Sequence, residues 1–343
     1  MGYYIKNGGL IGVEEIPDKT GVYDMIASQV IGDFLYPFTS HSFTNASTTG
    51  LDGPTLAACQ TAYSGAAFLI SNFSVTDGIQ RWTVPINGTY TFTIRGAGGG
   101  NGYTNGSSNN RGGYGRILNG TIELTKGEQL DILIGQRGTD GNPAASCGTA
   151  SGGGGGGTFV YNVTTSTWLL VAGGGGGGAT ATANDSGTLR ILQDANGGND
   201  GLDSRGISTP SGGTNGGGGT GSISGTYGCV GGAGGGGGIT GDGTYGYFSG
   251  DFGKAFNNSI SPGQGGNSSY RVGGFGGGGS SGYYTAGGGG GYSGGAGGGL
   301  PTCSCTQLFA GGGGGSYYNA TYVTLSSNTI YSSLDHGLFT LTA

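Results

Sequence analysis

The chain has 343 residues, including 90 glycines and 8 prolines, and carries a formal net charge of −6. Aromatic residues make up 10% of the sequence and charged residues only 9%. Disordered chains are rich in charge and poor in aromatic residues, so this composition argues against a solvated linker. The glycines come in runs rather than at every third position, which excludes collagen. The 12 basic residues are scattered singly, which argues against nucleic-acid binding.

Residues 1–36 differ in composition from the rest, because they hold five of the 18 acidic residues and no long glycine run. The first residues lack the basic region and apolar core of a signal peptide. No apolar run in the sequence is long enough to predict insertion into a membrane. We interpret residues 1–36 as a docking segment that attaches the protein to a larger assembly. An edge strand that forms a lid on the following domain is an equally good interpretation.

Residues 37–96 show the alternation of a β-sandwich. Three strands are predicted here, at 68–73, 80–84 and 89–95. Tyr90, Phe92 and Ile94 alternate with threonines, so one face of the last strand should be buried and the other wet. This stretch is therefore expected to form the first part of the sandwich.

Residues 97–316 are rich in glycine, with strands and loops in between. Two six-glycine runs, 152–157 and 173–178, bracket a strand-like segment at 158–172, and two further strands are predicted at 117–126 and 129–135. Fixing one backbone costs roughly 1–2 kcal/mol, which is about what one hydrogen bond returns. Order therefore requires that nearly every N–H and C=O is paired. Polyproline II-like helices of polyglycine can bond laterally in this way, so we expect a bundle of polyglycine II helices.

Residues 317–343 return to strand patterns, and a terminal strand needs a partner. The open sandwich of residues 37–96 offers one. The fold class expected is therefore all-β, a sandwich whose two halves lie at opposite ends of the chain. The glycine-rich region 97–316 would be an insertion between these halves.

No pattern in the sequence predicts an enzyme, a cofactor or a metal site. The cysteines include no CxxC pair, and only His41 and His336 could join them in a metal site. His41 is expected in a Ser/Thr-rich loop and His336 in the turn before the last strand, and neither belongs to a motif around a nucleophile. Asp242 and Asp251 could act as a glycosidase pair only if the fold brought them within roughly 5–10 Å. The five cysteines are Cys59, Cys147, Cys229, Cys303 and Cys305.

Ten Asn-x-Ser/Thr sequons are present, which could carry glycans only if the protein is secreted. Without a signal sequence we expect them to be unmodified. The sequons begin at Asn45, Asn72, Asn87, Asn105, Asn119, Asn162, Asn184, Asn257, Asn267 and Asn319.

Short motifs follow one another in a specific order over roughly residues 80–343. They are QRWTVP at 80–85, GTY at 88–90, GAGG at 96–99, LTKG at 124–127, LDILIGQRG at 130–138, the glycine runs within 152–178, GGFG at 273–276, the glycine-rich stretch 287–295 and HG at 336–337. In this order they resemble the glycine-rich extracellular domain of the anaplastic lymphoma kinase and leukocyte tyrosine kinase receptors. The resemblance implies a TNF-like, jelly-roll β-sandwich that carries an inserted bundle of polyglycine helices.

The same resemblance bears on assembly and function. TNF-like sandwiches commonly associate in threes, so a homotrimer is expected. Such glycine bundles also resemble the tips of certain phage adhesins, and residues 4–12 resemble the start of virion proteins from aquatic phages. We therefore expect a virion surface protein, such as a phage fibre tip, adhesin or decoration protein, that docks on another virion protein through residues 1–36. The alternative is a secreted, self-assembling extracellular fibre or matrix protein, and a soluble ligand-binding relative of the receptor domain ranks third.

The tyrosine-rich loops are the candidate surface for a host receptor or glycan. Tyrosine offers a large contact area at low entropic cost and a hydroxyl group for polar ligands. The alternative is that these rings cover the sides of the glycine bundle. The candidate residues are Tyr245, Tyr247, Phe248, Phe252, Phe256, Tyr283 and Tyr284.

Overall fold

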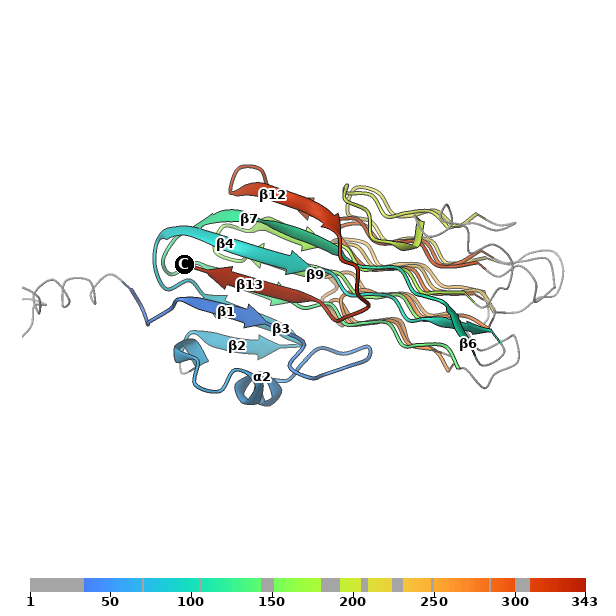
Figure 1. Ribbon diagram of the computed structural model, residues 1–343, viewed down its shortest axis with the longest axis horizontal. Coiled ribbons are helices and arrows are strands. Elements are labelled where there is room, and N and C mark those ends of the chain that lie inside the picture. The colour runs from blue at the N-terminus through green and yellow to red at the C-terminus, as the bar shows by residue number, and fades with distance from the viewer. Residues whose placement is uncertain are drawn as a thin grey trace, which may run out of the picture.

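The computed structural model has two antiparallel β-sheets packed as a sandwich, with extended glycine-rich segments running on from one end of it (Figure 1). This confirms the expected all-β sandwich. Within the described part of the chain, no helix is long and apolar enough to cross a membrane. The structure describes residues 34–69, 71–104, 107–142, 151–179, 192–204, 209–223, 231–247, 250–269, 271–283, 285–299 and 309–343.

One sheet has five strands in the order β1-β13-β4-β7-β12. The C-terminal strand β13 pairs with β1 on one side and with β4 on the other, so both ends of the described chain contribute to this sheet. The expected pairing of the last strand with the N-terminal sandwich strands is confirmed. The strands are β1 (Ser40–Phe43), β4 (Gly88–Arg95), β7 (Arg116–Leu124), β12 (Val323–Ile330) and β13 (Leu338–Thr342).

The other sheet has six strands in the order β11-β10-β9-β8-β3-β2. They are β2 (Phe73–Thr76), β3 (Ile79–Thr83), β8 (Gln129–Leu133), β9 (Thr158–Asn162), β10 (Thr167–Ala172) and β11 (Tyr317–Tyr318). Outside the two sheets lie the helix α2 (Leu56–Ala62), the 3-10 turn η1 (Ala67–Leu69) and a small ribbon of β5 (Gly102–Thr104) and β6 (Ser107–Asn110).

The main hydrophobic core fills the space between the sheets. Tyr90, Phe92 and Ile94 of β4 are buried, whereas Thr89 is exposed on the opposite face. Trp82 of β3 is fully buried opposite them. The predicted alternation in residues 89–95 is thus confirmed, and it follows from the two-residue period of side chains along a strand.

Four expectations about the strands need correction. The predicted strand at 68–73 is instead η1 followed by the start of β2, and His41 lies in strand β1 rather than in a loop. The segment 158–172 is a hairpin of two strands, because Ser166 adopts a positive φ and turns the chain. The strands β7 to β10 also belong to the sheets, so the sandwich draws on the middle of the chain as well as on its two ends.

The glycine-rich segments that lie outside the strands between residues 96 and 316 form what we call the glycine layer. The run 152–157 shows how its segments bond. Successive N–H groups donate in rotation to three neighbouring segments, 175–178, 136–139 and 276–279, with N···O distances of 2.8–3.0 Å. The same partner segment returns at every third residue, whereas a β-strand would repeat after two.

The Cα atoms of the same run face three other segments in the same rotation. A Cβ atom added at 152 or 155 would meet the segment 98–100, one at 153 or 156 would meet 272–275, and one at 154 or 157 would meet 288–291. At 152–156 the nearest approach would be 2.4 Å or less, at which something must shift, and at 157 it would be a tight 3.0 Å. The run is therefore surrounded by six segments, and there is no room for a side chain at positions 152–156.

We expect alanine to be equally harmful at three successive positions of this run. Gly153→Ala, Gly154→Ala and Gly155→Ala should each lower the free energy of unfolding by about 2 kcal/mol or more, because each new methyl meets backbone. Gly88→Ala is the matched control, since a Cβ at Gly88 meets nothing within 4 Å, and it should change the free energy by less than about 0.5 kcal/mol. Urea unfolding of the four variants measures this. A cost at alternate positions only would contradict the threefold arrangement.

His41 belongs to an aromatic cluster at the edge of the core. Its ring meets Phe43, Tyr63 and Phe68 edge-on, with centroids 4.6–4.7 Å apart. Its Nε2 atom is buried and has no hydrogen-bond partner among the described residues. Burial lowers the pKa of His41 from 6.5 to about 4, because the charged form would lose its hydration.

Stability should therefore fall as the pH drops below about 6.5 towards 4. The unfolded chain takes up a proton on His41 in this window while the folded chain does not, so the contribution is complete above the unfolded pKa and is lost on acidification. The shift sets an upper limit of roughly 3.4 kcal/mol on this contribution, and because His41 is only partly buried, screening by solvent keeps the contribution below that limit. His41→Phe should flatten the dependence of the melting temperature on pH relative to the wild type. The same acid sensitivity in both proteins would rule out His41 as the cause.

Candidate functional site

The structure divides the predicted binding residues into exposed and buried ones. The side chains of Tyr245 and Tyr247 are 64% and 37% exposed, whereas Phe252 and Phe256 are only 9% and 6% exposed. Exposed rings can contact a partner directly, and buried rings can only position their neighbours. The segment that carries these residues lies on the glycine layer, and its glycines are packed against inner segments, as Gly253 is against Gly277.

Three other candidates contribute less. Tyr283 is half-buried and packs so closely on Gly231 that a Cβ there would overlap with it. Phe248 and Tyr284 lie outside the described residues. The surface must therefore be built from Tyr245 and its neighbours.

Phe256 must be removed from the candidate surface, because it covers the six-stranded sheet. Its ring lies 4.8 Å from that of Trp168 in an edge-on contact and 5.6 Å from that of Phe159. Both partners come from the hairpin β9–β10, so Phe256 attaches the glycine layer to the sandwich. For this residue the interpretation as cover for the bundle describes the structure better than that of a receptor contact.

The exposed Tyr245 belongs to a compact group with the buried Phe252 and the half-buried Lys254 and Asp242, and we call these four residues the Tyr245 surface. The Tyr245 ring stands edge-on to Phe252, with centroids 4.4 Å apart and planes at 87°. The Lys254 ammonium lies 3.8 Å from the centre of the Phe252 ring and 3.9 Å from Oδ2 of Asp242. Phe252 thus contacts both the exposed Tyr245 ring and the Lys254 ammonium group.

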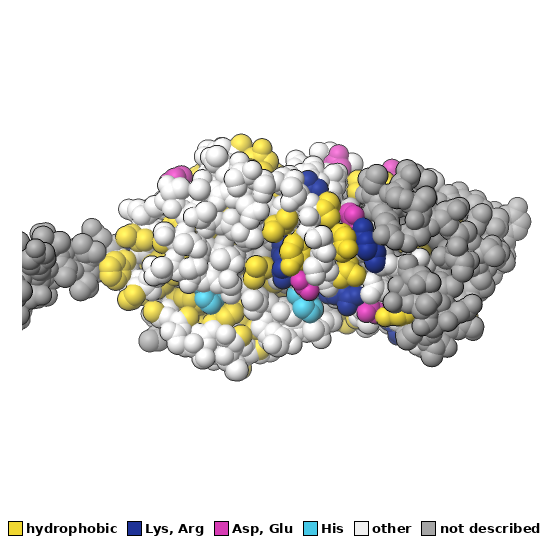
Figure 2. All heavy atoms as spheres, in the orientation of Figure 1, with side chains coloured by type: hydrophobic (Ala, Val, Ile, Leu, Met, Phe, Trp, Pro, Cys, Tyr) yellow, Lys and Arg dark blue, Asp and Glu magenta, His cyan; other side chains and the backbone are white. Residues whose placement is uncertain are grey.

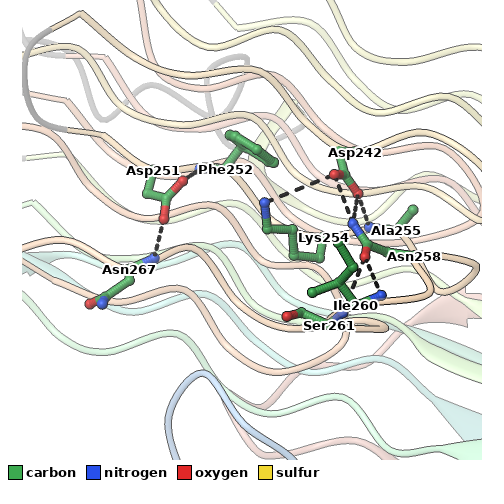
Figure 3. Close-up of polar contacts among 9 residues, drawn as sticks. All are labelled: Asp242, Asp251, Phe252, Lys254, Ala255, Asn258, Ile260, Ser261 and Asn267. Atoms are coloured by element: carbon green, nitrogen blue, oxygen red, sulfur yellow. Dashed lines mark hydrogen bonds and ion pairs between the residues drawn. The ribbon is translucent and has the colours of Figure 1, made fainter. Parts of the chain in front are cut away.

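The polar contacts below this surface fix its backbone (Figure 3). Oδ1 of Asp242 accepts the N–H of Ala255 at 2.7 Å, and both its carboxylate oxygens accept from Nδ2 of Asn258 at 3.2 and 3.0 Å. Asn258 in turn accepts the N–H groups of Ile260 and Ser261. A chain of side-chain bonds therefore connects the lysine beside Tyr245 to a loop further along the sequence.

Asp251 plays a similar structural part. Its carboxylate accepts the N–H of Phe252 at 2.9 Å and that of Asn267 at 3.3 Å (Figure 3). The carboxylates of Asp242 and Asp251 both accept hydrogen bonds from backbone N–H groups, so they stabilise the local backbone.

Figure 2 shows a second group of charged side chains on the face that carries the five-stranded sheet, where the sandwich meets the glycine layer. The guanidinium of Arg95 lies 4.4 Å from the centre of the Tyr331 ring, and its Nε donates to the carbonyl of His336 at 3.0 Å. Nδ1 of His336 accepts the N–H of Arg137 at 3.0 Å. Burial, with Arg137 and Arg95 nearby, lowers the pKa of His336, which is therefore neutral at pH 7.

Arg111 adds to this junction. Its guanidinium stacks 3.7 Å from the centre of the Tyr114 ring and binds both carboxylate oxygens of Asp194 at 2.8 and 3.1 Å. Arg95, Arg111 and Arg137 each precede a glycine directly in the sequence, a signal that marks the entry of a glycine segment but was not recognised in the sequence. We call these three arginines with their partners the junction belt, and its internal pairing indicates a role in stability.

Neither the cysteines nor a metal cluster supplies further chemistry in the described part of the chain. Cys59 of α2 is fully buried, and burial raises the pKa of its thiol to about 12, so it is unreactive. The other four cysteines lie outside the described residues. No group of three or more His, Cys, Asp or Glu residues able to hold a metal ion occurs among the residues that the structure describes.

The sequons differ in their accessibility. Asn162 is a poor acceptor, because it is only 3% exposed and its Oδ1 accepts the N–H of Thr165 at 3.2 Å. Including it among the possible glycan sites was wrong, since a glycan there would not fit the folded sandwich. Asn105 and Asn184 lie outside the described residues. Of the others, Asn87, Asn257 and Asn267 are exposed, and Asn45, Asn72, Asn119 and Asn319 are half-buried.

Comparison with known proteins gives a partial match. No protein-family model matches the sequence. The chain is similar to the Leukocyte tyrosine kinase receptor of Mus musculus, with 34% identity over 106 residues. The match covers 30% of this chain and 12% of that protein. The similarity supports the expected link to this receptor family over the matched part, and it leaves most of the receptor's length without a counterpart here.

Proposed function

We propose that this chain is a surface-exposed binding protein in which a glycine scaffold presents the Tyr245 surface to a host receptor or glycan. The observation that carries the proposal is the exposed Tyr245 ring, held by Phe252 on a segment whose backbone is fixed. An exposed tyrosine ring in a group that also contains an ammonium group suits hydroxyl-rich and anionic ligands such as glycans. A rigid scaffold lowers the entropic cost of binding.

We further propose that the glycine layer is a bundle of polyglycine II helices. In the run 152–157, the partners of the N–H groups and the segments that the Cα atoms face both rotate with a period of three residues. This supports the proposal, because a polyproline II helix has three residues per turn. The alanine series at 153, 154 and 155 tests it, because alanine should be destabilising at all three successive positions of a packed helix with this period.

The setting that we propose is the surface of a virion, as a phage fibre tip, adhesin or decoration protein. Residues 34–36 lie at the end of the sandwich away from the glycine layer (Figure 1). Docking of residues 1–36 on another virion protein would therefore leave the glycine layer pointing away from the particle. In this setting the binding surface faces the host.

A secreted, self-assembling extracellular fibre is the second candidate, and two observations favour it. Three sequons, at Asn87, Asn257 and Asn267, are exposed in the folded protein. The similar part of the mouse protein belongs to a protein named as a receptor.

We expect Tyr245→Ala to lower glycan binding by about tenfold or more, because truncating a central tyrosine removes most of its contact area. An array of bacterial surface polysaccharides, probed with purified protein, measures the loss. Tyr318→Ala is the matched control, since Tyr318 is 41% exposed on β11. The proposal fails if both variants bind as the wild type does, or if the wild type binds no polysaccharide on the array and none on intact host cells.

The intact mass of the protein from its native source should separate the two settings. We expect unmodified asparagines, because a virion protein assembles without passing through a secretory route. Glycans on Asn87, Asn257 or Asn267 would contradict the proposal of a virion protein and favour the secreted extracellular fibre. Asn162 should remain bare in either case, and it serves as an internal reference in the peptide map.

A further inference from the structure

A groove of about 430 Å³ opens where the sandwich meets the glycine layer. One wall is the segment 52–56 before and at the start of α2, and the second is the β2–β3 turn with Val75, Asp77 and Gly78. The third wall comes from the segment 260–264. Three stretches that are far apart in the sequence thus meet around one cavity.

The walls of this groove are fixed by hydrogen bonds between the sandwich and the glycine layer. The N–H of Gly265 donates to the carbonyl of Leu51 at 2.8 Å, and Nε2 of Gln264 donates to Oδ1 of Asp52 at 2.6 Å. Nε2 of the buried Gln136 donates to the carbonyl of Asp52 at 2.9 Å. The groove is therefore preformed, and a ligand would not have to order its walls.

The floor depends on two glycines that touch across the groove. A Cβ at Gly53 or Gly78 would overlap with the other glycine and with the ring of Phe275. Gly78 also has a φ of +79°, which an L side chain rarely adopts. The Phe275 ring beneath the two glycines is only 1% exposed, so the floor is closed. The backbone of Gly53 and Gly78 therefore limits the depth of the groove.

The lining combines carboxylates with exposed apolar side chains. Of the described residues, Asp52 and Asp77 are the charged ones that line it, and none of its described lining residues is a lysine, arginine or histidine. Asp77 is exposed, and its carboxylate has no hydrogen bond or ion pair among the described residues. Leu56 and Ile260 are 38% and 87% exposed. The backbone of Ile260 is held by Asn258 (Figure 3), so this large exposure belongs to an ordered residue.

We propose that this groove binds a lysine side chain of a partner polypeptide. The four-carbon stem of the lysine packs along Leu56 and Ile260, and its ammonium group lies against the carboxylates of Asp52 and Asp77. Lysine fits better than a neutral apolar residue, because a neutral occupant would desolvate Asp77 without offering it a partner. Charge complementarity also excludes acidic ligands. The inference stands independently of whether the Tyr245 surface binds a receptor.

The test is a titration of the full chain with Nα-acetyl-lysine N-methylamide, followed by the NMR signals of the Leu56 and Ile260 methyl groups. The matched probe is Nα-acetyl-norleucine N-methylamide, which has the same stem length and no charge. We expect the lysine probe to shift both methyl signals in a saturable way. The norleucine probe should bind at least about fivefold more weakly, and added salt should weaken the lysine probe only.

Asp77→Asn tests the charge in the protein. Asparagine tolerates the positive φ of 49° at this position, so the turn is retained. We expect this variant to bind the lysine probe about fivefold more weakly. Asp200→Asn, at an exposed aspartate away from the groove lining, should bind as the wild type does. Equal binding of the two probes, unchanged binding in Asp77→Asn, or the absence of any shift at Leu56 and Ile260 would each overturn the proposal.

Discussion

The direct contact of glycine backbones with one another is the constraint on which the rest of the structure depends. In the run 152–157, N–H groups and Cα atoms face six other segments, and almost all of these contacts are made by backbone. Each residue contributes a hydrogen bond and close packing but no side chain, so the stabilisation per residue is small and cooperative. One added methyl group would push two segments apart and break the hydrogen bonds on both sides of it.

This constraint places the hydrophobic burial elsewhere. The large apolar side chains gather between the sheets and at the junction, where Phe159 of β9, Phe256 and Phe275 form a second core cluster with their neighbours. The junction belt supplies the polar counterpart, since Arg95, Arg111 and Arg137 each bind a carboxylate or carbonyl group at the edge of the glycine layer. The sandwich is therefore the anchor that lets a weakly self-stabilised glycine layer remain ordered.

Much of the sandwich could be predicted from the sequence, because strand patterns such as Tyr90-Thr91-Phe92 report directly on which side is buried. The hairpin in 158–172 was missed because its turn depends on Ser166 at a positive φ, and the segment contains no glycine or proline that would predict a turn. Phe252 and Phe256 look equivalent in the sequence, yet one supports Tyr245 and the other covers Trp168. Their roles depend on which neighbouring segment lies against each ring, and that is set by tertiary packing.

The groove was missed for a related reason, since Asp52 and Asp77 each precede a glycine and locally have the pattern of ordinary turns. Only the contact between Gly53 and Gly78 over Phe275 brings the two carboxylates to one cavity.

Most buried positions of the glycine layer are glycine, and many of the others carry small side chains such as those of Ala286 and Ser293, so the composition of a segment indicates how deeply it is buried. The run 152–157 has no residue but glycine and is buried throughout, whereas the segment 242–256 keeps glycine only where it packs inward, as at Gly243 and Gly253. Tyr245 and Lys254 occupy positions of that outer segment that face solvent at least in part. A mutation at either position changes the surface and its contacts with Phe252, and it leaves the glycine backbone contacts in place. A scaffold that tolerates almost no substitution at its glycine contacts can therefore carry an outer surface that varies.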